Sequence, residues 1–369
     1  MATADVTLSA DQARWVRLVG HGLAARRRPG GVVEVASAVC GLQAQLDSSP
    51  GLSVRVRRPG TGPAEVRAEL LERRGVVRTW LQRGTLHVVA SEELALYAAA
   101  VGASVTKRET RLWERRGLPA AEVGRVNDVV LETLAGGPLT RAVLAERVAA
   151  VLGPAAGEVV GHPWGIGLKP AAASGLICFG APAGREVTFT RVDDWLGPAK
   201  EWQEVDARAW VLRRFLIANG PSTRSRFARW SGLSAGEVAG AWSALEAGLR
   251  PVGVAGHTCW YPADHPLPAT PGPPALYLLP AFDAFTLGAP DPGALAGPDH
   301  VGDIFRKAGW ISPVVLAGGR AAGTWKLTRS RGQPRVTLNL FRPLQKSERS
   351  DLEPEIAGVE QFAAGDAKD

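Results

Sequence analysis

Two glutamines separated by one residue, Gln43 and Gln45, have a side-chain type and spacing that could support catalysis. In an extended segment, residues two apart face the same side, so the pair would present two amides together. An amide oxygen is too weakly basic to remove a proton from water at neutral pH. It can orient a water molecule, and its dipole can stabilise a developing positive charge. Such a pair suits a hydrolysis whose leaving group departs easily, for example a cationic N7-alkylguanine that leaves its sugar as a neutral base. Taken alone the pair is a weak signal, because two glutamines near a helix end are more often surface residues without function.

The flanking sequence predicts the elements that must position this pair. Ser9 is placed to cap a first helix, and a second helix is expected over 32–40. After the glutamines, residues 52–58 alternate apolar and polar side chains, which fits a strand or a short helix. A helix over 63–73 and a strand pair over 76–81 and 85–89 follow. Helices followed by a two-stranded ribbon are the order expected of a winged helix.

An internal repeat suggests that this unit recurs. Residues 137–145 and 220–228 share Gly, Pro, Thr, Arg and Ala at matching positions. Thr140 and Thr223 would each cap the middle helix of a helix-turn-helix unit, and strand-like pairs follow each copy. Beyond residue 265, short apolar runs between glycines and prolines predict a small β-rich domain, and the tail after Ser350 predicts a helix.

Composition narrows the function. The chain has 369 residues and a formal net charge of +7, and all of this excess lies within residues 1–120, whereas the tail from residue 345 is acidic. A basic body favours a polyanionic partner such as nucleic acid, although an arginine-rich proteome would give the same balance. Cys40, Cys178 and Cys259 are too few and too far apart for a disulfide framework or a zinc site. The histidines lack metal-ligand spacing and no phosphate-binding loop motif occurs, so no metal or cofactor is expected.

The sequence has no apolar leader and no stretch of 18 apolar residues, so we expect a cytoplasmic protein, associated with the nucleoid when it is bound to DNA.

Several motifs, in order along nearly the whole chain, resemble the tandem winged-helix DNA glycosylases. This family includes the AlkZ-like enzymes that unhook interstrand crosslinks and protect producers of DNA-alkylating natural products. The motifs are the segments 41–45, 77–87, 278–285 and 309–316, followed by Gly323-Thr324-Trp325. One segment departs from the pattern, because residues 288–292 read Gly-Ala-Pro-Asp-Pro where many relatives have Gly-Tyr-x-Asp-Arg.

The resemblance implies an α+β fold with three tandem winged-helix units and a C-terminal β-rich, barrel-like domain around a basic channel. The corresponding boundaries are 1–118, 119–202, 203–266 and 272–369. It also implies that Gln43 and Gln45 are the catalytic residues of a Gln-x-Gln signature.

Other polar residues are candidates for DNA contacts, each with a plainer alternative. Arginines around the first ribbon and near the third unit's second helix could bind phosphates, or could simply be solvated. A tryptophan in the third ribbon could wedge into the duplex or belong to the core. The candidates are Arg78, Arg83, Thr85, His87, Lys169, Arg224, Arg226 and Trp260. For His87 the commoner alternative is a strand-end hydrogen bond, and for Lys169 a solvated side chain. Asp283 is expected to be a buried structural carboxylate or a functional one.

Together these features predict a monofunctional DNA glycosylase for bulky N7-alkylguanine adducts or interstrand crosslinks, giving self-resistance to a DNA-alkylating natural product. It is expected to act as a monomer on double-stranded DNA and to leave an abasic site without cutting the strand, because no lysine is proposed as a Schiff-base nucleophile. The alternatives are a non-catalytic multi-winged-helix regulator and a scaffold that uses its helices for protein contacts.

Overall fold

Helix caps and turn residues begin the elements where the sequence predicts them. In this computed structural model, Ser9 and Gln12 form a capping box, in which each backbone N–H donates to the other residue's side chain at 2.8 and 3.2 Å. Thr140 accepts a hydrogen bond from the Val143 N–H, and Thr223 accepts one from the Arg226 N–H. Both repeated threonines are therefore N-caps, as predicted. The structure describes residues 6–24, 30–268, 270–272, 275–330 and 332–366.

The chain forms two compact units, each assembled from several segments. Unit 1 contains the described residues up to Glu69, Leu212–Phe227, and the chain from Leu245 onward. Unit 2 contains Leu70–Val211 and Ala228–Ala244. The helices α11 (Glu204–Asn219) and α12 (Arg224–Ser231) each contribute residues to both units, and so does α4 (Pro63–Leu71). The fold is mixed α+β with small sheets, as predicted. No helix in the described ranges is long and apolar enough to cross a membrane.

Unit 1 is built around a helix that the sequence left ambiguous. The alternating run 52–58 is helical, within α3 (Ser48–Arg57), and every side chain of α3 from Ser49 onward is buried. The other N-terminal elements of unit 1 are β1 (Val6–Leu8), α1 (Ala10–Gly20), α2 (Val32–Ala38) and β2 (Leu42–Gln43). The expected helices over 32–40 and 63–73 are thus confirmed.

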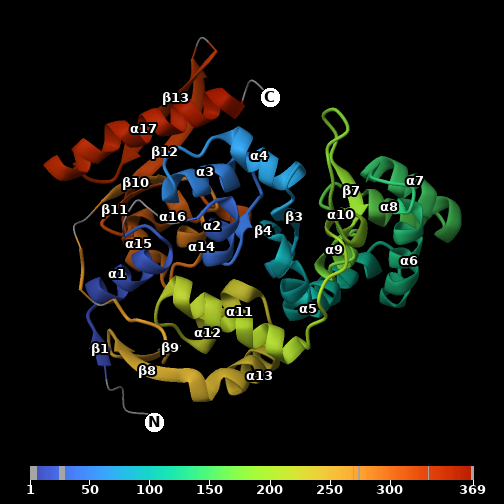
Figure 1. Cartoon of the computed structure of the whole chain (residues 1–369), viewed down its shortest axis with the longest axis horizontal. Helices are drawn as coiled ribbons and strands as arrows, with labels where there is room; N and C mark the ends of the chain where they lie inside the picture. Colours follow the sequence, from blue (N-terminus) through green and yellow to red (C-terminus); the bar gives the residue numbers. More distant parts are fainter. Residues whose placement is uncertain (1–5, 25–29, 269, 273–274, 331, 367–369) are drawn as a thin grey trace. The chain divides into compact units, whose positions relative to one another are not determined.

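The C-terminal part of unit 1 is an open sheet covered by a helix. Four strands pair antiparallel in the order β10 (Leu276–Leu279), β11 (Val314–Ala317), β12 (Arg320–Ser330) and β13 (Gln333–Leu340). The predicted tail helix is present as α17 (Lys346–Asp366), which packs along β10 and β13 (Figure 1). The short helices α14 (Ala284–Leu287), α15 (Pro292–Ala296) and α16 (Val301–Ile304) lie between β10 and β11 in sequence. The domain is β-rich as expected, but its described strands do not close into a barrel.

A second sheet of unit 1 joins the N-terminus to a distant hairpin. The strands β8 (Leu249–Val254) and β9 (His257–Pro262) form the predicted ribbon after α13 (Ala235–Leu245). Their turn places Ala255 and Gly256 at φ values of 49° and 81°, the two positive angles of a tight hairpin turn. The short β1 adds to β8 in parallel, with Val6 opposite Val252. This strand was not predicted from the sequence.

Unit 2 contains the other two ribbons and a long central helix. The first ribbon is β3 (Val76–Trp80) with β4 (Leu86–Ala90), as predicted, followed by α5 (Leu94–Glu114). A helix cluster, drawn in green in Figure 1, then leads to a sheet of order β5-β7-β6. Its elements are α6 (Val123–Leu134), β5 (Leu139–Thr140), α7 (Arg141–Leu152), α8 (Pro154–Gly161), α9 (Lys169–Ala173), β6 (Ile177–Phe179), β7 (Thr188–Arg191) and α10 (Val192–Leu196). Trp80, Phe179 and Phe189 stack in its core.

Candidate active site and DNA-binding residues

The two glutamines lie where the short strand β2 gives way to a bend that leads into α3. Gln43 ends the strand and its residue is only 7% exposed, whereas Gln45 lies in the bend and is exposed. The strand ends at Gln43 and does not include Gln45. The expectation that one extended segment presents both glutamines on the same side is therefore not met. One amide therefore sits in the protein interior, where its dipole is poorly screened by water, and the other faces solvent.

Helix α3 is anchored by ion pairs that sequence reasoning missed. The Arg57 guanidinium donates to both carboxylate oxygens of Asp283, at 2.8 and 2.9 Å, and neither side chain has any exposed surface. Ser53, one turn earlier in α3, donates to the same carboxylate at 2.7 Å. Burial is the largest influence and alone would raise the pKa of Asp283. The Arg57 charge and the hydrogen bonds from Arg57, Ser53 and the Phe285 N–H together outweigh it, so the pKa lies below its usual value. The spacing of Ser53 and Arg57, four residues apart, was the available signal that this run is a helix with one polar face.

A second buried basic residue and a histidine complete this cluster in unit 1. Arg17 donates to the Phe285 carbonyl and its guanidinium lies 3.8 Å from the centre of the Phe285 ring. His21 contacts Asn219, with 3.2 Å between Nε2 and Oδ1. Burial, and then the charges of Arg17 and Arg57, lower the pKa of His21 well below its usual value. Asp283 also caps α14 through the Phe285 N–H, so it is a buried structural carboxylate, the first of the two expected alternatives.

His87 of unit 2 makes the strand-end hydrogen bond expected as its commoner role. Its Nδ1 lies 2.9 Å from the Thr85 carbonyl oxygen, so Nδ1 carries the proton and Nε2 is the unprotonated nitrogen. Burial, followed by the nearby Arg83 charge, lowers the pKa of His87 to about 3. The ring is therefore neutral at physiological pH and cannot act as a cationic phosphate ligand. Thr85 itself donates to the Gln82 carbonyl at 3.0 Å.

Three of the basic candidates in unit 2 make contacts inside the protein. Arg83 donates to the Trp230 carbonyl, and burial, followed by the Arg108 charge, lowers its pKa to about 10. The Arg78 guanidinium lies 5.0 Å from the centre of the Phe179 ring. Lys169 is not simply solvated, because its Nζ lies 3.4 Å from the buried carboxylate of Glu109. Their role in DNA binding stays a prediction.

The candidates near the third ribbon differ in exposure. Arg224, at the start of α12, is exposed, and Arg226 is half-buried. Trp260 is half-buried in the middle of β9, where its backbone exchanges hydrogen bonds of 2.8 and 3.1 Å with Ser222. The exposed tip of this hairpin is instead formed by residues 255–258. A wedge at the tip would therefore come from those residues, and the proposed role of Trp260 stays a prediction.

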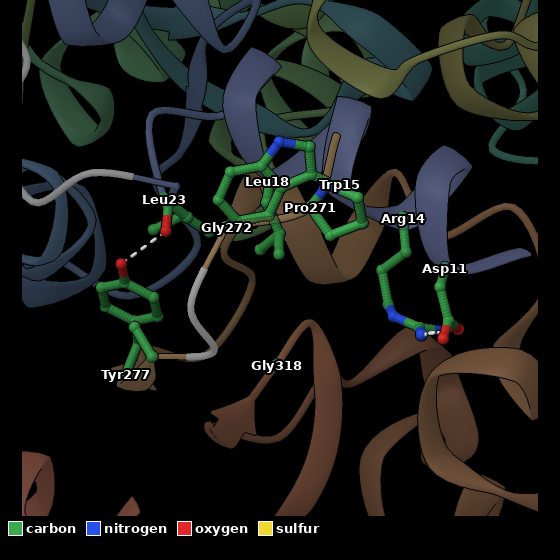
Figure 2. A pocket seen from close by; sticks show the side chains of 10 residues that line it. Asp11, Arg14, Trp15, Leu18, Leu23, Pro271, Gly272, Tyr277 and Gly318 are labelled. Atoms are coloured by element: carbon green, nitrogen blue, oxygen red, sulfur yellow. Dashed lines mark hydrogen bonds and ion pairs between the residues drawn. The ribbon is translucent and has the colours of Figure 1, made fainter. Parts of the chain in front are cut away.

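Two cavities among the described residues of unit 1 differ greatly in size. One, of about 710 Å³, begins at Leu46 and Ser48, directly after Gln45, and extends to Trp310 and Trp325. The other, shown in Figure 2, measures about 160 Å³ and lies among Trp15, Pro271 and Tyr277. Sites for drug-sized ligands usually measure about 300–1,000 Å³. Only the first of these two cavities has a volume in that range. It adjoins residues 43–47, which we call the glutamine loop, because Leu46 is part of its lining.

Comparison with known proteins identifies the family to which this chain belongs. Residues 36–362 match the sequence model described as DNA glycosylase AlkZ-like. The chain belongs to the AlkZ-like DNA glycosylase family. The enzyme is therefore a DNA glycosylase, and the resemblance seen in the sequence is confirmed. This also decides against a non-catalytic regulator or scaffold as the main function.

Relatives of this AlkZ-like glycosylase match it over most of their length. A protein named interstrand DNA cross-link repair glycosylase from Streptomyces sahachiroi is 30% identical over 308 residues, which cover 80% of this chain and 81% of the relative. The structure of the Streptomyces sahachiroi DNA glycosylase AlkZ matches with a TM-score of 0.86 at 26% identity, covering 97% of this chain and 98% of that one. The fold of the family is thus present nearly end to end.

Proposed function

We propose that this glycosylase hydrolyses the N-glycosidic bond of bulky N7-alkylguanine adducts or interstrand crosslinks, and thereby protects its host against a DNA-alkylating natural product. The observation that carries the proposal is the placement of Gln43 and Gln45 at the junction of a buried strand and a buried helix, beside a large cavity. The name of the Streptomyces relative, a cross-link repair glycosylase, supports the same substrate class.

The two amides have different roles in the hydrolysis because one is buried and the other is exposed. An N7-alkylguanine is already cationic, so the bond to C1′ breaks with its electron pair going to the base, which leaves neutral. Gln45, exposed to solvent, orients the attacking water. After the C1′–O bond forms, the water loses a proton to solvent. Gln43, in a less polar environment, directs its carbonyl dipole at the positive charge that develops on the sugar. The products are a free base and an abasic site on an uncut strand.

DNA binding is assigned to the helix groups that precede each ribbon. We infer that the elements within 1–118, 119–202 and 203–266 form three winged-helix units, because each consists of helices followed by an antiparallel strand pair. The boundary of the C-terminal β-rich part, 272–369, belongs to the same proposal. The exposed Arg224 near the N-terminus of α12 is suited to a phosphate contact.

The test is base release from duplex DNA that carries a single N7-alkylguanine. Wild type should release the base, and Gln43→Ala or Gln45→Ala should slow release at least about tenfold while DNA binding persists. Gln203→Ala, at an exposed glutamine outside the loop, is the matched control and should act like wild type. Nicks should appear only after alkali treatment. Full activity in both loop variants, or no release by wild type, would contradict the proposal.

A further inference from the structure

The large cavity of unit 1 is continuous with the glutamine loop. Its lining includes Leu46, Ser49 and Leu52 from the N-terminal part of the unit, and Trp310, Pro313 and Trp325 from the C-terminal part. Leu46 directly follows Gln45, so a group bound in the cavity would lie close to the proposed catalytic loop. At about 710 Å³, the cavity has far more room than a methyl group on guanine requires. The cavity is therefore large enough for a substituent much bigger than a methyl group.

Trp310 gives this cavity an aromatic wall that is left partly open. The residue is 40% exposed, and its ring packs edge-to-face against Phe282 with 5.2 Å between ring centres. Its backbone is fixed, because its carbonyl accepts from the Arg306 N–H at 2.8 Å and a bridge between Phe305 and Ile311 closes the loop. A held, half-exposed indole beside a cavity is suited to stacking against a flat ligand.

The residues behind this wall are equally well fixed. Phe282 is buried and has a φ of 59°, a left-handed conformation that a phenylalanine rarely adopts. The next residue, Asp283, is held by Arg57 of α3, the same helix that begins after the glutamine loop. Elsewhere in the lining, the Trp325 indole N–H donates to the Leu279 carbonyl at 2.7 Å. The walls therefore need little rearrangement when a ligand binds, which lowers the cost of binding.

Several charged residues line the cavity at exposed positions. Arg306 and Lys326 are exposed lining residues, and the lining residue Asp303 contacts His300, with 3.0 Å between Oδ2 and Nδ1. Ser312 is a buried polar residue beside the aromatic wall. This arrangement suits an occupant with a flat apolar body that enters from a negatively charged polymer.

We propose that this cavity binds the exocyclic, aromatic part of a bulky N7-alkylguanine lesion, so that the enzyme prefers adducts with an aromatic substituent over simple alkyl adducts. The proposal rests on the proposed function and adds the chemical class of the group that the enzyme selects. Trp310 stacks on the substituent and the cavity excludes water from its apolar surface.

The experiment compares two probes, duplexes that carry either N7-methylguanine or N7-(naphthylmethyl)guanine at one position. For each enzyme the quantity measured is the ratio of naphthylmethyl to methyl release rates under single-turnover conditions. In Trp310→Ala the ratio should fall about five- to tenfold, as expected for one lost aromatic stacking contact. In Asn339→Trp, which fills the cavity from an exposed lining position on β13, the ratio should also fall. Trp310→Phe should retain most of the wild-type ratio, because it keeps an aromatic ring at this position.

Trp164→Ala is the matched control, because Trp164 is an exposed tryptophan of unit 2 outside this cavity. Its ratio should equal that of wild type. An unchanged ratio in both Trp310→Ala and Asn339→Trp would overturn the cavity proposal while leaving the proposed function intact. Failure of wild type to release either base would instead overturn the proposed function, and the cavity proposal with it.

Discussion

Arg57 and Asp283, 226 residues apart in sequence, form a fully buried ion pair with two hydrogen bonds. Arg57 ends the helix that begins after the glutamine loop, and Asp283 follows Phe282, the ring that supports Trp310. The pair therefore ties the proposed catalytic loop to the proposed lesion cavity. Arg57 donates in addition to the carbonyls of His21 and Ser53, at 2.8 and 2.9 Å, so its guanidinium has partners on several sides.

Breaking this pair should be costly for stability. In Asp283→Asn the buried Arg57 charge loses its counter-ion, and we expect the free energy of unfolding to fall by about 3–5 kcal/mol. Urea unfolding followed by circular dichroism measures the change. The control is Glu122→Gln, which removes an exposed pair with Arg125 and should cost only about 0–1 kcal/mol. If both variants lost the same free energy of unfolding, the buried ion pair would be no more stabilising than the surface pair, and the prediction would be wrong.

Base release should depend little on pH near neutrality. Amides do not titrate in this range, and the pKa of about 3 keeps His87 neutral. We expect single-turnover release of N7-methylguanine, measured with saturating enzyme, to be nearly constant from about pH 6 to pH 9. The spontaneous rate at each pH must be subtracted. A bell-shaped profile would show that a titrating acid or base acts in place of the amides.

Acid should destabilise the fold through its buried histidines. The unfolded chain takes up protons on histidine near pH 6.5, whereas folded His87 stays neutral down to about pH 3 and the pKa of His21 is also depressed. Between these limits the unfolded state binds more protons, so stability is present above pH 6.5 and is lost as pH falls. His87→Asn should make the dependence shallower in urea titrations at several pH values. His257→Gln, at the exposed hairpin tip, should not.

Arg224 should contribute to DNA affinity through charge. If it contacts a phosphate, Arg224→Ala should reduce the slope of log affinity against log salt by about one, with similar losses on all DNA sequences. Arg224→Lys keeps the charge and should retain the slope. Fluorescence anisotropy with an undamaged duplex at several salt concentrations gives these values. A loss of affinity at constant slope would indicate that Arg224 acts by a route other than phosphate neutralisation.

Local signals predicted much of the fold, and distant partners account for most of what was missed. Ser9, Thr140 and Thr223 are caps that depend only on residues nearby, so the sequence was sufficient to place them. The helix α3 was ambiguous because the carboxylates that bind Arg55 and Arg57 lie 300 and 226 residues further along. A three-residue strand such as β1 carries no periodic signal, and only its pairing with β8 defines it.

The candidate site shows the same division. The spacing of Gln43 and Gln45 was visible in the sequence, but their different burial depends on where β2 ends. The contacts of Arg83 with the Trp230 carbonyl and of Lys169 with Glu109 are tertiary, so arginine and lysine side chains expected to face solvent or DNA have protein partners. The cavity at Trp310 could not be predicted, because its walls come from segments on either side of a gap of more than 200 residues in the sequence.

The segmented make-up of the two units constrains how the protein is made. The chain passes from one unit to the other after residues 69, 211, 227 and 244. On the ribosome, the glutamine loop and α3 emerge early, but Asp283 and the β10–β13 sheet of unit 1 emerge only after every residue of unit 2. The nascent Arg57 side chain therefore has no Asp283 carboxylate to pair with until that later segment of unit 1 is made. A chain cut before residue 280 would also lack the Trp310 and Trp325 side chains that line the lesion cavity.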